Sequence, residues 1–486
     1  MNSQRFSISI VALLFAALAC NLGSAIAPEP PTATALPTLI PTNETFQPTV
    51  SPPALSPTLA VPNAPLSASG PWLIFSASDG LWAINSDGSG LTQMAETASY
   101  IKSNAVAPGG GHLAFITSTD FTGLHDLKLN LITLPQGDVQ TLTPLRSAAA
   151  ESGPEPSFGD PAFEAVRAIV DLPGMAWSPD GRKLAFIGAQ DGPSADLYVY
   201  SLDDGSIARL TDGPSQAYDP SWSPDGKNIV QLGADQFGTG AGYSMAGVWA
   251  ARADGSAVVS LYKPNSGDEV ILGWTAPDTF AVYSFDAGCS YRNFRLFNIE
   301  TRTETVLWKN YFTSAALDPA SGRAMISVDD FVASCNQDSR KGMFLISAGS
   351  EPKRVSDEAS FLITWSKEAD LFFAPLETTM LIVTPSGDVI QPPAPMETIP
   401  AVAPDGKSWA WPGRQAQDLF ASISNAPPLL VYSGFVPTQS WSPDGKTLIF
   451  VGDGMMYAAY SPGFNYAPIT NNFDLENGGV WAWVRP

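Results

Sequence analysis

The chain has 486 residues, of which 44% are hydrophobic and 10% aromatic, with 41 glycines and 43 prolines. This composition supplies a large core and suits a loop-rich all-β fold. The formal net charge of −22 argues against nucleic acid as a partner, because phosphate binding requires clustered Lys and Arg, and against docking of the protein surface onto anionic lipid.

The N-terminus carries an export signal. Residues 7–19 are apolar but too short for a comfortable membrane span, and Arg5 precedes them, so residues 1–19 are predicted to be a secretory signal peptide. The segment 17–20, Ala-Leu-Ala-Cys, resembles the lipobox of bacterial lipoproteins, although the usual Leu and small residue are exchanged. The resemblance implies that Cys20 is lipidated and becomes the mature N-terminus. Plain secretion with cleavage after Ala27, or a retained anchor, remains open.

A low-complexity segment follows. Pro and Thr recur over residues 28–69 with almost no charge and no periodicity, so this stretch cannot build a core. We therefore expect residues 20–70 to be a lipidated cysteine followed by an extended, partly polyproline-like linker. The expected location is the outer face of the bacterial cell membrane or envelope, with membrane contact only through the lipid.

A recurring phrase dominates the rest of the chain: AWSPDGRKLAFIG at 176–188, SWSPDGKNIVQLG at 221–233 and SWSPDGKTLIFVG at 440–452. In Ser-Pro-Asp-Gly, Pro sets φ for a type I turn that Asp and Gly complete, so each copy predicts a β-hairpin. Each is followed by a second apolar segment, a turn and a short final strand. Four short strands per repeat, labelled a to d, describe one propeller blade. Weaker copies lie at 105–115, 273–283, 316–326, 364–373 and 401–411.

These repeats predict one all-β domain over residues 71–486, a single propeller of four-stranded antiparallel blades. Residues 71–95 match strands b to d without a strand a, and residues 478–486 match a strand a alone. The two fragments complete each other, so the C-terminal strand is expected to close the ring. The predicted ring has eight or nine blades. Its other repeats fall at 100–145, 175–213, 219–264, 270–310, 312–357, 360–395, 399–434 and 438–472.

Two insertions interrupt the repeats, at 147–174 and at 234–244. In the first, Asp160 as N-cap and Pro161 at the first helical position predict a short helix. The insertions belong to d–a and b–c connections, which emerge on one side of an antiparallel propeller, here called the loop face. The a–b and c–d turns define the opposite turn face. Because function is usually carried by loops, the loop face is the candidate binding face, although the insertions are also compatible with mere tolerance. Its candidate contact residues are Phe121, Tyr243, Tyr291 and Phe331.

Two cysteines remain once Cys20 is assigned to lipid. Cys289 and Cys335 both follow the second strand of neighbouring repeats. Equivalent loops of adjacent blades lie side by side, so a disulfide is expected, with two free thiols as the alternative. No cluster of Cys and His accompanies them, and we predict no metal site and no cofactor.

The WSPDG phrase followed by an apolar strand resembles the TolB-type, WD-like β-propeller repeat, which also occurs in prolyl oligopeptidase-like enzymes and in bacterial envelope lipoproteins. The resemblance implies the fold but not the function. A peptidase of that kind needs an α/β-hydrolase domain, for which we find no room. The nearest nucleophile-elbow string, 242–246, lacks its last Gly and falls in a predicted loop. The two histidines, His112 and His125, are expected near opposite faces, which disfavours a triad.

No catalytic residue is therefore predicted. The expected function is a monomeric, non-catalytic scaffold that binds a protein, peptide or glycan of the envelope or the extracellular medium. The alternative is a glycan-active hydrolase or lyase with carboxylates in the central funnel, and a purely structural envelope role is a third possibility. The repeat aspartates are interpreted as turn formers: Asp180, Asp225, Asp405 and Asp444. The repeat tryptophans are interpreted as packing between blades: Trp177, Trp222, Trp365 and Trp441.

Overall fold

The computed structural model describes residues 65–486, with gaps at 78–79, 97–99, 121–123, 238–242, 265–267, 287, 337–339, 393, 395, 425 and 471–479. The predicted signal peptide, Cys20 and most of the linker lie outside the described residues, as does Phe121. Among the described residues, no helix is both long and apolar enough to cross a membrane.

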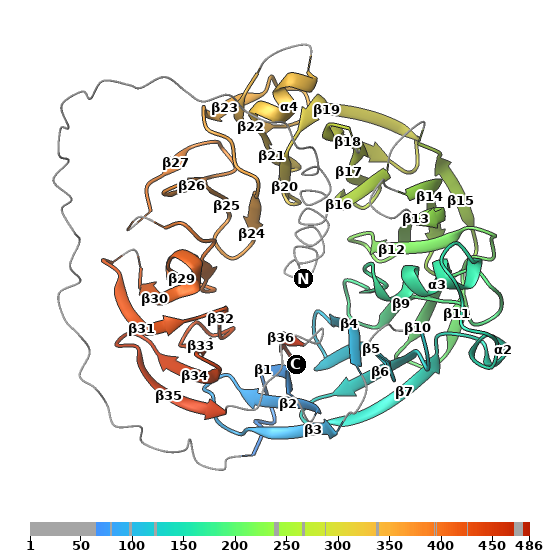
Figure 1. Ribbon diagram of the computed structural model, residues 1–486, viewed down its shortest axis with the longest axis horizontal. Coiled ribbons are helices and arrows are strands. Elements are labelled where there is room, and N and C mark those ends of the chain that lie inside the picture. Colours follow the sequence, from blue (N-terminus) through green and yellow to red (C-terminus); the bar gives the residue numbers. More distant parts are fainter. Residues whose placement is uncertain are drawn as a thin grey trace, which may run out of the picture. The chain divides into compact units, whose positions relative to one another are not determined.

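Nine four-stranded antiparallel sheets succeed one another around a ring (Figure 1), which confirms the propeller and sets the blade number at nine. Strand a of each blade lies nearest the centre and strand d at the rim.

The first three blades are built as follows. Blade 1 contains β36 (Trp481–Val484), β1 (Trp72–Ala77), β2 (Gly80–Asn85) and β3 (Thr92–Glu96); blade 2 contains β4 (Tyr100–Val106), β5 (His112–Ser118), β6 (Lys128–Thr133) and β7 (Asp138–Pro144); blade 3 contains β8 (Met175–Trp177), β9 (Lys183–Gly188), β10 (Asp196–Ser201) and β11 (Ile207–Arg209).

The next three blades include the longest strands. Blade 4 contains β12 (Gln216–Trp222), β13 (Asn228–Phe237), β14 (Tyr243–Arg252) and β15 (Val258–Tyr262); blade 5 contains β16 (Asp268–Ala276), β17 (Thr279–Asp286), β18 (Ser290–Asn298) and β19 (Thr303–Phe312); blade 6 contains β20 (Ser314–Asp318), β21 (Arg323–Val328), β22 (Gly342–Ile346) and β23 (Lys353–Ser356).

The last three blades include the shortest strands. Blade 7 contains β24 (Thr364–Ser366), β25 (Leu371–Pro375), β26 (Met380–Val383) and β27 (Val389–Ile390); blade 8 contains β28 (Ala401–Val402), β29 (Trp409–Pro412), β30 (Gln417–Ser422) and β31 (Leu429–Phe435); blade 9 contains β32 (Thr438–Trp441), β33 (Thr447–Gly452), β34 (Met455–Tyr460) and β35 (Asn465–Thr470).

The repeat turns share one hydrogen-bond pattern, built on an aspartate. In blade 3, Asp180 Oδ1 accepts from Ser178 Oγ at 2.6 Å and from the Arg182 amide at 3.0 Å. Asp225 and Asp444 accept from the equivalent hydroxyl and amide, and Asp405 accepts from the Lys407 and Ser408 amides. These aspartates therefore form turns on the turn face, as the sequence predicts.

Indole hydrogen bonds join neighbouring blades. In each link, a buried or half-buried Trp on strand a donates its Nε1–H to strand a of the preceding blade. The acceptor is the residue just before the position that corresponds to the Trp. The five links are Trp177 to Ala105 O (2.9 Å), Trp222 to Ala176 O (2.9 Å), Trp274 to Ser221 O (3.3 Å), Trp441 to Ala401 O (3.1 Å) and Trp483 to Ser440 Oγ (2.8 Å).

Blade 2 and blades 6 to 8 depart from this pattern. Val106, Leu317 and Val402 stand at the Trp position in blades 2, 6 and 8. In blade 7, Trp365 is only half-buried and packs on Phe372 of its own blade, with ring centroids 4.6 Å apart. Trp365 also packs against the cluster that joins blades 6 and 7, so it lies between blades as Trp177, Trp222 and Trp441 do.

The C-terminal strand closes the ring as predicted. β36 pairs antiparallel with β1, with Trp72 opposite Val484 and Phe75 opposite Trp481. The same strand reaches both neighbouring blades, because Trp483 bonds blade 9 and the Gly111 amide of blade 2 donates to Arg485 O at 2.7 Å. Closure removes two sheet edges and links three blades.

A buried ionic network spans blade 5. Arg295 of β18 forms an ion pair with Glu269 of β16 at 2.7 Å, and both side chains are buried. Ser284 Oγ and Tyr262 OH donate to the two Glu269 oxygens at 3.0 and 3.2 Å, and Arg295 Nε donates to Glu304 at 3.1 Å. Burial raises the pKa of Glu269, against the opposing effect of Arg295. The network joins all four strands of the blade to β15 of blade 4.

The two insertions differ from each other. The first contains α2 (Ala148–Glu151) and α3 (Pro161–Val170), and Asp160 is the N-cap of α3 as expected. The buried face of α3 packs on β9, β12 and β13, so this insertion is part of the core of blades 3 and 4. The second was expected to be a loop, but residues 234–237 and 243–244 extend the β13–β14 hairpin with two register shifts. These residues continue both strands of the hairpin beyond the length of a regular blade.

Ring closure predicts a large effect of charge at Val484, which is fully buried, and little effect at its exposed neighbour Arg485. Val484→Asp should lower the free energy of unfolding by at least about 3 kcal/mol, because it buries an unpaired carboxylate. Arg485→Asp is the matched control and should stay within about 0.5 kcal/mol of the parent. Urea unfolding of both variants measures this, and equal midpoints would contradict the role of β36.

The turn aspartates predict acid sensitivity. The Ser178 hydrogen bond holds the pKa of Asp180 below its usual value. In Asp225, Asp405 and Asp444, partial burial acts to raise the pKa, but similar hydrogen bonds outweigh it, and the pKa is lowered there too. A lowered folded-state pKa contributes stability above the unfolded value of about 3.9, and this is lost as pH falls through the folded value.

The quadruple variant D180N/D225N/D405N/D444N should therefore have a lower urea midpoint at pH 7, and its midpoint should fall less than that of the parent between pH 5 and pH 2. Substituting four exposed glutamates provides the control: E155Q, E351Q, E358Q and E377Q. An unchanged acid response in the aspartate variant would refute the linkage.

Candidate functional site

The loop face of blades 5 and 6 is covalently linked. Cys289, between β17 and β18, forms a disulfide with Cys335, between β21 and β22, with Cα atoms 6.1 Å apart. The bridge closes a 46-residue separation. It joins the b–c connections of two adjacent blades, which is the arrangement that the sequence suggests.

A short helix, α4 (Asp330–Cys335), is held on this face by further contacts. The Asp329 side chain caps it by accepting from the Val332 amide at 2.8 Å, and Val332 is buried. After the helix, the Asn336 side chain forms two hydrogen bonds with the backbone of Tyr311 on β19. Its Oδ1 accepts from the Tyr311 amide at 2.7 Å, and its Nδ2 donates to Tyr311 O at 3.2 Å. The helix is therefore fixed to blade 5 at its C-terminal end and to its own blade by Val332.

The outward side of this helix presents Phe331, which is 62% exposed. Phe361, 75% exposed, lies in the connection between β23 and β24. The neighbouring Ser360 ties that connection to the end of β21, because its amide donates to Ser327 Oγ at 2.8 Å. Two large apolar side chains are thus presented at the same end of blade 6. We call the segments 329–336 and 357–363 the blade 6 corner.

Other blades also expose phenylalanines on the loop face. Four of the large apolar side chains that the described residues expose are phenylalanines in d–a or b–c connections or at their edge: Phe158, Phe331, Phe361 and Phe435. The other eight lie on or beside outer strands, where single exposed apolar residues are ordinary. They are Leu91, Val139, Val258, Val259, Val306, Val389, Leu429 and Tyr466.

The structure places the predicted contact residues in different environments. Phe331 lies on the loop face and is exposed. Tyr291 is half-buried in an aromatic cluster, 4.8 Å from the Tyr283 ring and 5.9 Å from the Phe312 ring, and burial raises its pKa; it supports the loop from beneath. Tyr243 begins β14 opposite Phe237 and belongs to a strand rather than a loop.

Phe158, Phe361 and Phe435 were missed by the sequence analysis. A signal existed for Phe158 and Phe361, because each is a lone aromatic residue inside a polar or glycine-containing connection: PSFGD at 156–160 and EASFL at 358–362. An apolar residue there continues no strand alternation. Phe435, in SGFVP at 433–437, ends β31.

Neither a metal-binding cluster nor a pair of neighbouring histidines occurs in the described part of the chain. No group of three or more His, Cys, Asp or Glu side chains there has a metal-binding arrangement. His112 starts β5 and contacts Thr133 Oγ1 at 3.0 Å, and burial lowers its pKa. His125 lies at the other end of blade 2, just before β6. The two imidazoles are therefore placed near opposite faces.

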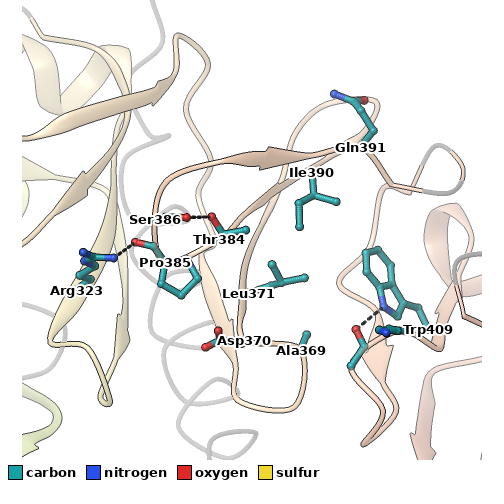
Figure 2. Close-up of a pocket in the computed structure, with 12 residues that line it drawn as sticks. Arg323, Ala369, Asp370, Leu371, Thr384, Pro385, Ser386, Ile390, Gln391 and Trp409 are labelled. Carbon is teal, nitrogen blue, oxygen red and sulfur yellow. Dashed lines mark hydrogen bonds between the residues drawn. The ribbon is translucent and has the colours of Figure 1, made fainter.

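A pocket of about 740 Å³ opens on the turn face where blades 6, 7 and 8 meet (Figure 2). The strands beside it are short, because β27 and β28 are only two residues long. The pocket is lined by Arg323, Ala369, Asp370, Leu371, Thr384, Pro385, Ser386, Ile390, Gln391, Gly406, Lys407 and Trp409.

Comparison with known proteins supports the fold. No family model matches the chain. A Bacillus subtilis (strain 168) protein named uncharacterized peptidase YuxL is 53% identical over 38 residues, which is 8% of this chain and 6% of that protein. The chain thus spans only a small part of that relative.

One solved structure supports the fold at low identity. The match to a crystal structure of the eukaryotic initiation factor covers 86% of this chain and 99% of that chain, with 13% sequence identity and a TM-score of 0.54. This similarity concerns the fold alone. The match to Porphyromonas gingivalis dipeptidyl peptidase 4 covers 84% of this chain and 60% of that chain, with 12% identity and a TM-score of 0.47. The match to TolB from Acinetobacter baumannii covers 58% of this chain and 65% of that chain, with 15% identity and a TM-score of 0.30.

The disulfide predicts a local effect on α4. Without reductant, neither Cys289 nor Cys335 should react with iodoacetamide in unfolded protein, whereas reduction should expose two thiols. The C289S/C335S variant should lose up to about 4 kcal/mol of unfolding free energy by the loop-entropy estimate. Limited proteolysis should then cleave the helix 329–336 first, and two alkylated thiols in unreduced protein would contradict the bridge.

Proposed function

We propose that this protein is an exported, lipid-anchored propeller that binds a protein, peptide or glycan of the envelope or extracellular medium on its loop face, as a monomer and without chemistry on the ligand. The observation that carries the proposal is the blade 6 corner, where Phe331 and Phe361 are exposed on anchored segments. Contiguous exposed apolar surface marks interaction sites on soluble proteins, and we propose that these two side chains form part of such a surface.

The corner has the physical properties of a binding surface. Aromatic side chains contribute much contact area with few rotatable bonds, and they dominate the energetics of many interfaces. The disulfide, the Asn336 contacts and the Ser360–Ser327 hydrogen bond hold the corner in place before binding. Less conformational entropy is then lost on association.

The anchoring part of the proposal rests on the sequence. The apolar segment 7–19, Cys20 and the Pro- and Thr-rich segment up to residue 69 support export, lipidation and a spacer. The net charge of −22 supports a partner other than nucleic acid or an anionic lipid surface.

The second candidate is an enzymatic role, either with carboxylates on the inner strands or as a peptidase, which the short YuxL match suggests. Two inner-strand acids already have structural partners. Glu269 pairs with Arg295, and Asp318 accepts from the Ala320 amide and Ser321 Oγ in a turn. Asp219 of β12 is the half-buried inner-strand carboxylate to substitute; hydrolysis of a peptide or glycan that D219N abolishes would favour the enzyme.

The loop-face proposal predicts that F331A/F361A abolishes partner capture. Cross-linked pull-downs from envelope extracts with the full chain should recover the partner at least about tenfold less with this variant, because both anchors are truncated. The control V306A/L429A truncates two other exposed apolar side chains, 52% and 49% exposed, on outer strands and should bind normally. Equal recovery by both variants would overturn the binding face.

The 147–174 insertion needs a point substitution rather than deletion. Its helix α3 is buried against blades 3 and 4, so deletion would disturb the core. Phe158→Ala tests its contribution on the loop face without that disturbance.

A further inference from the structure

We infer that the turn-face pocket at blades 6 to 8 is a second binding site, for a saccharide that carries a single carboxylate. This site lies on the face opposite the blade 6 corner and does not depend on the function proposed for that corner. Its residues come from three blades, and its volume of about 740 Å³ falls within the usual range of small-ligand pockets.

Two cations line the pocket, and Lys407 interacts electrostatically with Asp405 of its own turn. Arg323 Nη1 donates to Pro385 O at 2.9 Å, which orients the guanidinium while leaving most of its donors for a ligand. Lys407 is exposed in the a–b turn of blade 8. Among the described residues, neither side chain lies within ion-pair distance of an acid. Guanidinium groups bind carboxylates in a planar, two-point geometry.

Hydroxyl-binding groups occupy the space between these cations. Asp370 and Gln391 are exposed at the pocket, and neither has a side-chain hydrogen bond within the described chain. Thr384 and Ser386 are bonded to each other at 2.8 Å, and Ser386 donates to Asp388 at 2.8 Å, so their hydroxyls are held in place. A carboxylate and an amide are suited to sugar hydroxyls, which both donate and accept.

Apolar groups complete the pocket. Figure 2 shows Arg323 at one end, Trp409 at the other, and Leu371 and Ile390 between them. A sugar ring presents C–H faces as well as hydroxyl edges, so it matches a pocket that mixes apolar and hydrogen-bonding groups. A purely apolar ligand would leave Asp370 and Gln391 desolvated and unpaired, at a cost in affinity.

The placement of the cations favours a ligand with one negative charge. Arg323, Lys407 and Asp370 are the charged residues of the pocket lining, and Asp388 and Asp405 lie next to Ser386 and Lys407, on a molecule with a net charge of −22. Arg323 can bind one carboxylate at short range, whereas the long-range field repels polyanions such as nucleotides and polyphosphates. A uronic-acid disaccharide satisfies both conditions.

The test is calorimetric titration of the full chain with a glucuronic acid-containing disaccharide, with cellobiose and with acetate. We expect saturable binding of the acidic disaccharide, weaker binding of cellobiose and none of acetate below about 10 mM. R323Q/K407Q should weaken the acidic disaccharide at least about tenfold while barely affecting cellobiose, and D370N should weaken both sugars.

The control variant K183Q/K227Q changes the same turn positions in blades 3 and 4 and should bind like the parent. Matching thermal melting of all variants shows that each is folded. Absence of saturable disaccharide binding, acetate binding as tight as the disaccharide, or parental affinity in R323Q/K407Q would each overturn the site.

Discussion

The propeller depends on how each inner strand is bonded to the preceding blade. A blade of four strands cannot bury two apolar faces alone, so its stability comes from packing against its neighbours. The Trp on strand a serves both purposes, because its ring fills the space between blades and its N–H satisfies a carbonyl or hydroxyl next door. Trp222, for example, is buried and bonds Ala176 at 2.9 Å. The turn aspartates hold the a–b turns tight, so the turn face has few long loops.

This division separates support from recognition. On the turn face, tight turns leave little surface for a ligand, and the pocket opens beside the short strands of blades 7 and 8. On the loop face, the connections are longer and are stabilised by added devices, namely the Cys289–Cys335 bridge, the Asn336 contacts and the buried face of α3. Both candidate binding surfaces therefore lie where the regular repeat is altered.

Features that arise from local chemistry were predictable from the sequence. The WSPDG turns, the closure by residues 481–484, the helix after Asp160 and the equivalent positions of the cysteines all follow from periodicity and turn geometry. The exposed Phe361 and the pocket were not predicted, because they depend on which side chains neighbouring blades leave uncovered. Tyr291 shows the same limit, since its loop position suggested contact with a ligand but its neighbours across the blade bury it.

The closure of blade 1 also determines how the domain bears mechanical load. The chain enters the ring at β1, which is paired on both sides, with β2 and with β36. Tension applied through the preceding segment therefore reaches an interior strand rather than an edge strand. Two rows of hydrogen bonds must shear together before β1 can leave, instead of one row opening bond by bond. Because resistance to pulling is governed by the unfolding rate, this attachment should slow the loss of β1 when the load acts along that strand from its N-terminal side.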